Sequence, residues 1–202
     1  SSNAGIASVG SATGVVTGNA TGSATITYSI AACFAVATVT VNANPAAINP
    51  PGGVAVCTGF STLLTNPSPG GTWSGSDNSL ATVGSATGIV TGGTAGNTTI
   101  SYTLGGCPAT RDITVNPLPS PIAGSFNVCV GATNILTSAT PGGTWASSRP
   151  AIATIGVGTG ALTGVATGTA TISYQLTRAC GTSTATKSVD VTATPTITLG
   201  SM

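Results

Sequence analysis

The side chains that most often perform acid–base chemistry are nearly absent from this sequence. It contains no His, and its three acidic residues are Asp77, Asp112 and Asp190. These aspartates are the only common general bases left. They occupy unrelated places in the sequence, one in a predicted turn and two on predicted late strands, so they cannot form a repeated acid pair. We therefore expect no catalytic site and no cofactor.

Cysteine is the other side chain that could carry chemistry here. Metal sites built on cysteine use closely spaced pairs such as CxxC, commonly joined by His. Neither is present, so we expect no metal site and conclude that the chain is not an enzyme. The five cysteines are Cys33, Cys57, Cys107, Cys129 and Cys180.

Low charge limits the partners that this chain can attract. Only 3% of its residues are charged, against about 25% in an average soluble domain, and its net charge is +1. That balance gives no electrostatic reason to expect a nucleic acid or an anionic membrane surface. No run of 18 or more apolar residues occurs, so membrane insertion is not expected either.

The sequence repeats itself almost residue for residue. The segment Val9–Gly18 recurs as Val83–Gly92 and, more loosely, as Ile155–Gly164. Aromatic residues and cysteines keep the same phase wherever they recur: a Tyr and a late Cys in three copies, a Trp and an early Cys in two. Self-similarity of this kind indicates an array of like structural units. The aromatic residues in phase are Tyr28, Tyr102, Tyr174, Trp73 and Trp145.

Within one copy, short strands alternate with strong turn signals. The run 97–104 alternates between apolar and polar residues, as a half-buried strand does, and no segment has a helical period. About seven such strands predict an all-β fold of immunoglobulin-like β-sandwiches, with the two Trp and three Tyr residues in their cores. In the second copy, strands are expected at 61–65, 80–83, 88–91, 97–104 and 109–115, with another around Trp73.

Four sequence patterns together resemble the bacterial Ig-like group 2 family. They are Gly-Gly-Thr-Trp-Ser, Leu-Ala-Thr-Val, Gly-Ile-Val-Thr-Gly and Thr-Thr-Ile-Ser-Tyr, in that order from Gly70 to Tyr102. Such domains occur in tandem in invasin- and intimin-type adhesins, and the Thr-rich, cysteine-bearing style is similar to giant exported repeat proteins of Bacteroidetes-type bacteria. The resemblance implies an Ig-like fold, export and an extracellular or cell-surface setting. It carries over no catalytic or binding residue.

Prolines mark the expected domain boundaries. We expect a partial repeat at 1–43 without its opening strands, complete repeats at 44–117 and 118–193, and the first strand of a following repeat at 194–202. Proline-rich linkers are stiff, so the repeats should form a semi-rigid rod. We expect the chain to run on into flanking repeats that complete both ends.

The cysteines allow two disulfide pairings in a secreted protein. Pairing within repeats joins Cys57 to Cys107 and Cys129 to Cys180, leaving Cys33 single. Pairing between neighbours joins Cys57 to Cys180. In an Ig sandwich the early turn and the late loop lie at opposite ends, which slightly favours the pairing between neighbours; an early Cys placed higher on its strand would favour the other.

Three functions fit these features to different degrees. The first is an extracellular structural stalk or filament whose partners are copies of itself or flanking repeats, because a nearly uncharged surface removes electrostatic repulsion. The alternative is an adhesin that binds a glycan or a host protein through loops or a terminal domain. Ice binding through the pairs Thr25–Thr27 and Thr38–Thr40 is a distant third, since twisted strands do not present a flat threonine array.

Overall fold

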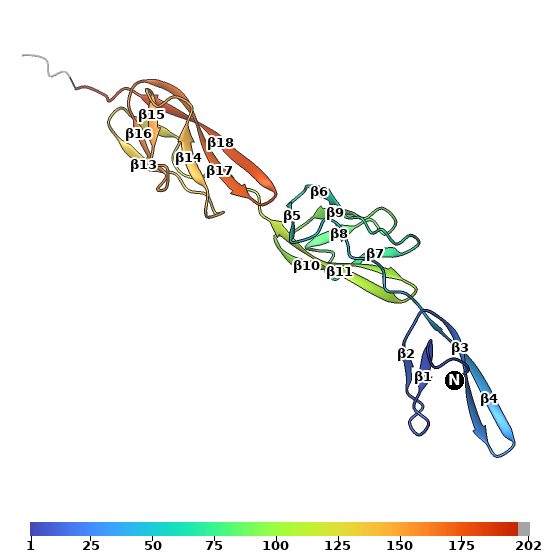
Figure 1. Cartoon of the computed structure of the whole chain (residues 1–202). Helices are drawn as coiled ribbons and strands as arrows, with labels where there is room; N and C mark the ends of the chain where they lie inside the picture. Colours follow the sequence, from blue (N-terminus) through green and yellow to red (C-terminus); the bar gives the residue numbers. More distant parts are fainter. Residues whose placement is uncertain (198–202) are drawn as a thin grey trace, which may run out of the picture. The chain divides into compact units, whose positions relative to one another are not determined.

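The computed structural model describes residues 1–197, and every regular element in that range is a β-strand (Figure 1). The prediction of an all-β fold is therefore confirmed. The strands group into the tandem sandwiches that the repeats indicated, and each group is described below by the predicted repeat to which it belongs.

The third repeat contains two sheets. Its four-stranded sheet has the order β12-β18-β17-β14, and its three-stranded sheet has the order β13-β16-β15. Four strands facing three is the arrangement of the smaller immunoglobulin domains. The strands are β12 (Asn127–Cys129), β13 (Thr133–Ile135), β14 (Thr144–Ser147), β15 (Ala153–Ile155), β16 (Ala161–Gly164), β17 (Gly168–Arg178) and β18 (Gly181–Thr192).

Alternation along β17 produces the core of this repeat. Ala170, Ile172, Tyr174 and Leu176 are buried, and polar residues stand between them. Because successive side chains of a strand point to opposite faces, this run gives the sheet one apolar face. Most of that face belongs to a single buried cluster with residues of the other sheet, among them Leu162.

The second repeat has the same two-sheet plan. The sheets have the orders β5-β11-β10-β7 and β6-β9-β8. The sequence predicted these strands within a few residues, except β5, for which it predicted no strand. The strands are β5 (Val54–Cys57), β6 (Ser61–Leu63), β7 (Thr72–Gly75), β8 (Ala81–Val83), β9 (Ile89–Gly92), β10 (Gly96–Leu104) and β11 (Cys107–Asn116).

The first repeat has fewer strands. Strands β1 (Ala7–Val9) and β2 (Val16–Gly18) pair with each other, as do β3 (Gly22–Ile30) and β4 (Cys33–Val41). Strand β3 corresponds to β10 and β17, yet within residues 1–197 it has no neighbour that corresponds to β7 or β14. The β3 edge of the hairpin therefore lacks the strand that pairs with it in the other repeats.

The turn between the two middle strands of each repeat depends on a glycine. Gly88 and Gly160 have φ of +70° and +69°, and the carbonyl oxygen of each accepts a hydrogen bond from the backbone of a buried leucine. A side chain at either glycine would meet the carbonyl oxygen of that leucine. Left-handed backbone in a tight turn explains these glycines.

By its contacts the chain divides into two compact units. One comprises Ser1–Val54, Thr62–Thr91 and Asn97–Ile113; the other comprises Ala55–Ser61, Gly92–Gly96 and the chain from Thr114 onward. This division passes through the predicted second repeat, and the repeat bounds remain a sequence-based prediction. Residues 194–197 form no strand, and the rest of the predicted strand 194–202 lies outside the described residues.

Candidate functional site

The three aspartates lie apart on different elements. Asp77 is in the connection between β7 and β8, where it accepts hydrogen bonds from the backbone and the hydroxyl of Ser79 at 2.8 and 2.6 Å. These bonds, the hydroxyl first, hold its pKa below the ordinary value. Asp112 on β11 accepts a 2.8 Å bond from Thr99, and Asp190 lies on β18. The Asp77 and Asp112 carboxylates thus take part in local hydrogen bonds, and within the described residues no cluster of side chains could hold a metal ion.

Each of the two complete repeats has a buried Trp–Tyr pair between its sheets. Trp145 of β14 is the cross-strand partner of Tyr174 of β17, with ring centroids 4.7 Å apart. Trp73 and Tyr102 are paired in the same way, at 4.8 Å. All four side chains are at most 7% exposed. These positions leave the two tryptophans no surface on which to bind a ligand.

The tyrosine hydroxyls tie the turn before the Trp strand to the sheet. The Tyr174 hydroxyl donates to the carbonyl of Thr140 and accepts from the backbone of Gly143, both at 2.8 Å. Tyr102 does the same with Ser68 and Gly71, at 2.5 and 2.8 Å. A buried hydroxyl with both its donor and its acceptor capacity used is a structural feature rather than a reactive one.

Tyr28 occupies the same phase as these tyrosines but does not belong to a core. Its side chain is 67% exposed, against 5% for both Tyr102 and Tyr174. The expectation that Tyr28 is buried is therefore wrong. The physical reason is the missing neighbour of β3, since no Trp-bearing strand lies against the ring.

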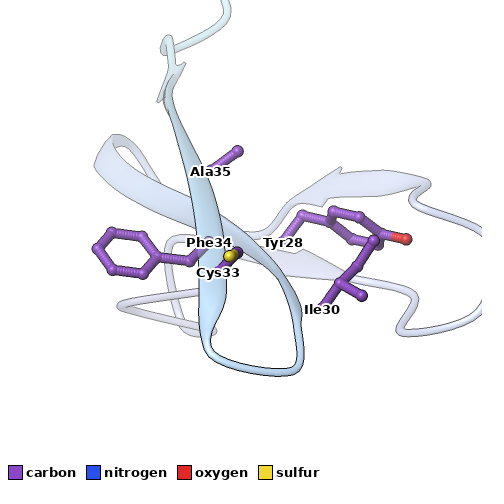
Figure 2. Close-up of a pocket in the computed structure, with 5 residues that line it drawn as sticks. All are labelled: Tyr28, Ile30, Cys33, Phe34 and Ala35. Atoms are coloured by element: carbon purple, nitrogen blue, oxygen red, sulfur yellow. The ribbon is translucent and has the colours of Figure 1, made fainter.

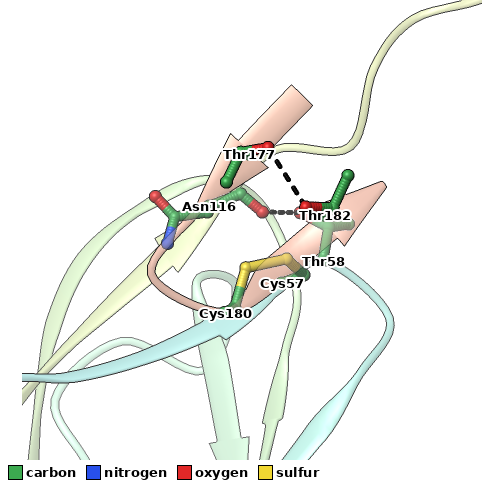
Figure 3. The surroundings of a disulfide bond; sticks show 6 residues. All are labelled: Cys57, Thr58, Asn116, Thr177, Cys180 and Thr182. Carbon is green, nitrogen blue, oxygen red and sulfur yellow. Dashed lines mark hydrogen bonds between the residues drawn. A yellow bond between two sulfur atoms is a disulfide. The ribbon is translucent and has the colours of Figure 1, made fainter. Parts of the chain in front are cut away.

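A disulfide joins Cys57 at the end of β5 to Cys180 in the turn between β17 and β18, with Cα atoms 5.7 Å apart (Figure 3). This is the pairing between neighbouring repeats. Next to it, the backbone of Thr58 donates to the carbonyl of Asn116 at 2.9 Å, and the hydroxyls of Thr177 and Thr182 are 3.1 Å apart. The bridge thus joins the β17–β18 turn of the third repeat to the end of strand β5 in the second repeat.

The other three cysteines are free thiols. Cys33 is exposed, while Cys107 and Cys129 are half-buried. The alternative pairs Cys57–Cys107 and Cys129–Cys180 are not formed, because both Cys57 and Cys180 are already bonded to each other. By sequence phase Cys33 and Cys107 correspond to Cys180, and Cys129 corresponds to Cys57.

The β3–β4 hairpin of the first repeat has an exposed apolar face. Ile26, Tyr28 and Ile30 alternate along β3, and Ala35 of β4 is the cross-strand partner of Tyr28, so these four residues lie on one face of the hairpin. Figure 2 shows Tyr28 and Ile30 pointing to one side of the hairpin and Phe34 to the other. Val16 is 38% exposed, whereas its counterparts Val90 and Leu162 are 0% exposed.

Four strands facing three, with a Trp–Tyr pair between the sheets, define the class of protein as tandem immunoglobulin-like β-sandwiches. The model of the bacterial Ig-like domain (group 2) family matches residues 61–114. None of the curated proteins matches the sequence.

Several solved structures with Ig-like folds are similar to the chain. A 282-residue C-terminal fragment of intimin, in complex with the intimin-binding domain of its translocated receptor, is 18% identical, with 59% of this chain and 50% of that fragment covered and a TM-score of 0.46. Domains 4 and 5 of the S-layer protein SbsC are 17% identical over 76% of this chain and all of that one, with a TM-score of 0.32. Human protocadherin-24 EC1-2 is 14% identical over 77% of this chain and all of that one, with a TM-score of 0.38. The chain spans about half the length of the intimin fragment.

Among the described residues, no helix has the length and apolar character that crossing a membrane requires.

Proposed function

We propose that this chain is part of an extracellular array of Ig-like repeats with a structural role, as a surface stalk or filament, and without catalysis. The observation that supports this most is the disulfide between Cys57 and Cys180. It links two predicted repeats covalently and so limits how far they can separate. Structural disulfides persist in oxidising, extracellular settings, in line with export.

The chemistry of the surface also favours a structural role. The charged groups of the chain are Lys+Arg 4 and Asp+Glu 3, and some of them are committed to internal contacts. Arg111 donates to the backbone carbonyls of Ile48 and Gly52, and the Lys187 ammonium lies 4.7 Å from the centre of the Phe126 ring. A surface so poor in charge lacks the repulsion that keeps proteins apart, which suits lateral packing of like chains.

The runner-up function is adhesion to a glycan or a host protein. Its support is the exposure of Phe34 and Phe60, which are 73% and 60% exposed. Exposed aromatic rings are common in binding surfaces. One ring is on β4 and the other is in the connection between β5 and β6, and neither belongs to a repeated motif, so we place the structural role first. The ice-binding alternative has no support beyond the threonines of β3 and β4.

The structural proposal predicts a long polypeptide on the cell surface. After complete denaturation and reduction, the native protein should have a mass several times the 19.1 kDa of these residues. Brief protease treatment of intact cells should release peptides of this sequence, with a cytoplasmic protein as the control that stays inside. A native mass near 19.1 kDa, or release only after lysis, would contradict the proposal.

A further inference from the structure

Charged side chains are distributed unevenly between the two sheets of each complete repeat. All of those on strands belong to the four-stranded sheets, whereas β6, β8 and β9 of the second repeat and β13, β15 and β16 of the third carry none. The three-stranded sheet is therefore the uncharged side of each sandwich. The charged residues on strands are Arg111, Asp112, Arg178, Lys187 and Asp190.

One face of the three-stranded sheet in the third repeat points to solvent. Leu162 is fully buried, so its neighbours along β16 point away from the core. Their cross-strand partners lie on the same face, and among them Ile135 is 58% exposed. We call this surface the third-repeat outer face; its residues are Thr133, Ile135, Thr154, Ala161 and Thr163.

The second repeat has a matching surface on its own three-stranded sheet. Leu63 and Ile89 take the positions of Ile135 and Ala161 in the repeat, and they are 55% and 48% exposed. Val90, the next residue along β9, is fully buried, so the alternation is the same. Each surface thus combines an apolar pair with hydroxyl side chains. We call this one the second-repeat outer face; its residues are Ser61, Leu63, Thr82, Ile89 and Thr91.

A charge of opposite sign stands at the start of the edge strand of each sheet. Asp77 precedes β8 and Arg149 precedes β15. Their backbone carbonyls accept hydrogen bonds from the first residues of these strands, Ala81 and Ala153, at 3.1 and 3.0 Å. The two positions are counterparts in the repeat, and both side chains are exposed. The same position is thus negative beside one outer face and positive beside the other.

We propose that the second-repeat outer face of one chain binds the third-repeat outer face of a second copy, with Asp77 opposite Arg149. This contact buries the exposed leucine and isoleucines of the two faces and places opposite charges at its rim. Two identical faces offer charges of one sign and no such attraction. The occupant is a second copy because the surface that complements the charge beside each face is the other face of the same chain.

Each contact of this kind is small. The strands of the three-stranded sheets have only three or four residues each, and strands about 4.8 Å apart with about 3.4 Å per residue give a face of roughly 200 Å². A stable interface between two proteins usually buries about 800 Å² on each partner. One contact is therefore weak, and many along an array add up to tight association. The proposal rests on the proposed function, because the array multiplies the contact.

Light scattering over a concentration series of the full chain measures the contact, with the free thiols alkylated so that no disulfide forms between chains. The unchanged chain should associate with a Kd on the order of 1 mM or tighter. Asp77→Arg makes both charges positive and Arg149→Asp makes both negative, so each variant alone should associate at least about tenfold more weakly. An equimolar mixture of the two variants should associate again. The double variant, which exchanges the charges and keeps the net charge of +1, should behave like the unchanged chain.

Two matched controls separate the faces from the rest of the surface. Asp190→Arg changes the net charge as Asp77→Arg does, but on a four-stranded sheet, and should leave association unchanged. Ile135→Ser should weaken association by about threefold or more, because it removes an apolar side chain from one face. Val157→Ser is its control, since Val157 is 63% exposed but lies in the turn between β15 and β16. Melting temperatures of all variants show that they are folded.

Three results would overturn the proposal. One is a charge-exchanged double variant that does not associate, and another is equal association of all the variants. The third is an unchanged chain that stays monomeric up to about 1 mM. The mass and the surface exposure of the native protein test the array separately, so a failed contact and a failed array are distinguishable.

Discussion

At the scale of single residues, the same side chain has opposite roles according to what lies against it. Tyr102 and Tyr174 are buried with both hydroxyl functions satisfied, whereas Tyr28, in the same phase of the repeat, is mostly exposed. The sequence pattern around the three tyrosines is nearly identical. Burial is therefore decided by the neighbouring Trp strand and not by the local sequence.

Replacing Trp145 by Ala should lower the free energy of unfolding of the third repeat by about 3–5 kcal/mol, because it removes a buried ring and leaves a cavity. Val157→Ala is the matched control: its side chain is 63% exposed, and its carbonyl still accepts from residue 145. The control should cost less than about 0.5 kcal/mol. Chemical denaturation followed by circular dichroism measures both. Equal costs for the two variants would mean that the ring is not part of the core.

Two glycines of one turn make a second matched pair. Gly160→Ala should destabilise the third repeat by about 1–2 kcal/mol or more, because Gly160 has a left-handed φ and a methyl group there meets the carbonyl of Leu136. Gly158 has open space around its Cα and an ordinary φ, so Gly158→Ala should be neutral or slightly stabilising. Thermal unfolding of both variants decides the matter, and a harmless Gly160→Ala would contradict the observed turn.

At the scale of elements, the hairpin β17–β18 combines two functions. Its length provides most of the apolar face of the third repeat, and its turn carries Cys180 to Cys57. Sequence alternation predicted the strands well, because half-buried strands show it directly. The disulfide pairing was only slightly favoured, because it depends on which end of a repeat meets its neighbour, and no local pattern in β5 records that.

Loss of this disulfide should destabilise the protein more than loss of any of the three free thiols. Cys180→Ser removes a crosslink between residues 123 positions apart, and losing a native disulfide typically costs about 2–5 kcal/mol. Cys129→Ser removes a free thiol and should leave the melting temperature almost unchanged. Calorimetry of the two variants, with reduction of the unchanged chain as a third sample, measures the difference. A Cys180→Ser melting temperature equal to that of Cys129→Ser would argue against the observed bridge.

At the scale of the whole molecule, the scarcity of charge has a consequence for acid stability. With no His and no Glu, no side chain has an ordinary pKa between about 5 and 8. The melting temperature should therefore be flat across that range. Hydrogen bonds from Ser79 lower the pKa of Asp77, so the stability it contributes is present above the ordinary value and disappears as the pH falls through the lowered one.

Thermal unfolding between pH 2 and pH 8 checks this expectation. Asp77→Asn should flatten part of the acid limb and leave the neutral plateau in place. A transition centred near pH 6.5 in the unchanged chain would require a titrating group that the sequence does not contain.

The connection from Cys57 to Cys180 also determines how the molecule responds to pulling. A force applied at the two ends passes through the disulfide, so the residues between the two cysteines carry no load even if their sandwiches unfold. With 123 positions between them and roughly 3.4 Å per extended residue, about 400 Å of contour length stays hidden until the bond is reduced. The oxidised chain is thus nearly inextensible over this segment. Reduction of the disulfide would allow the segment to unfold under force and would release this contour length.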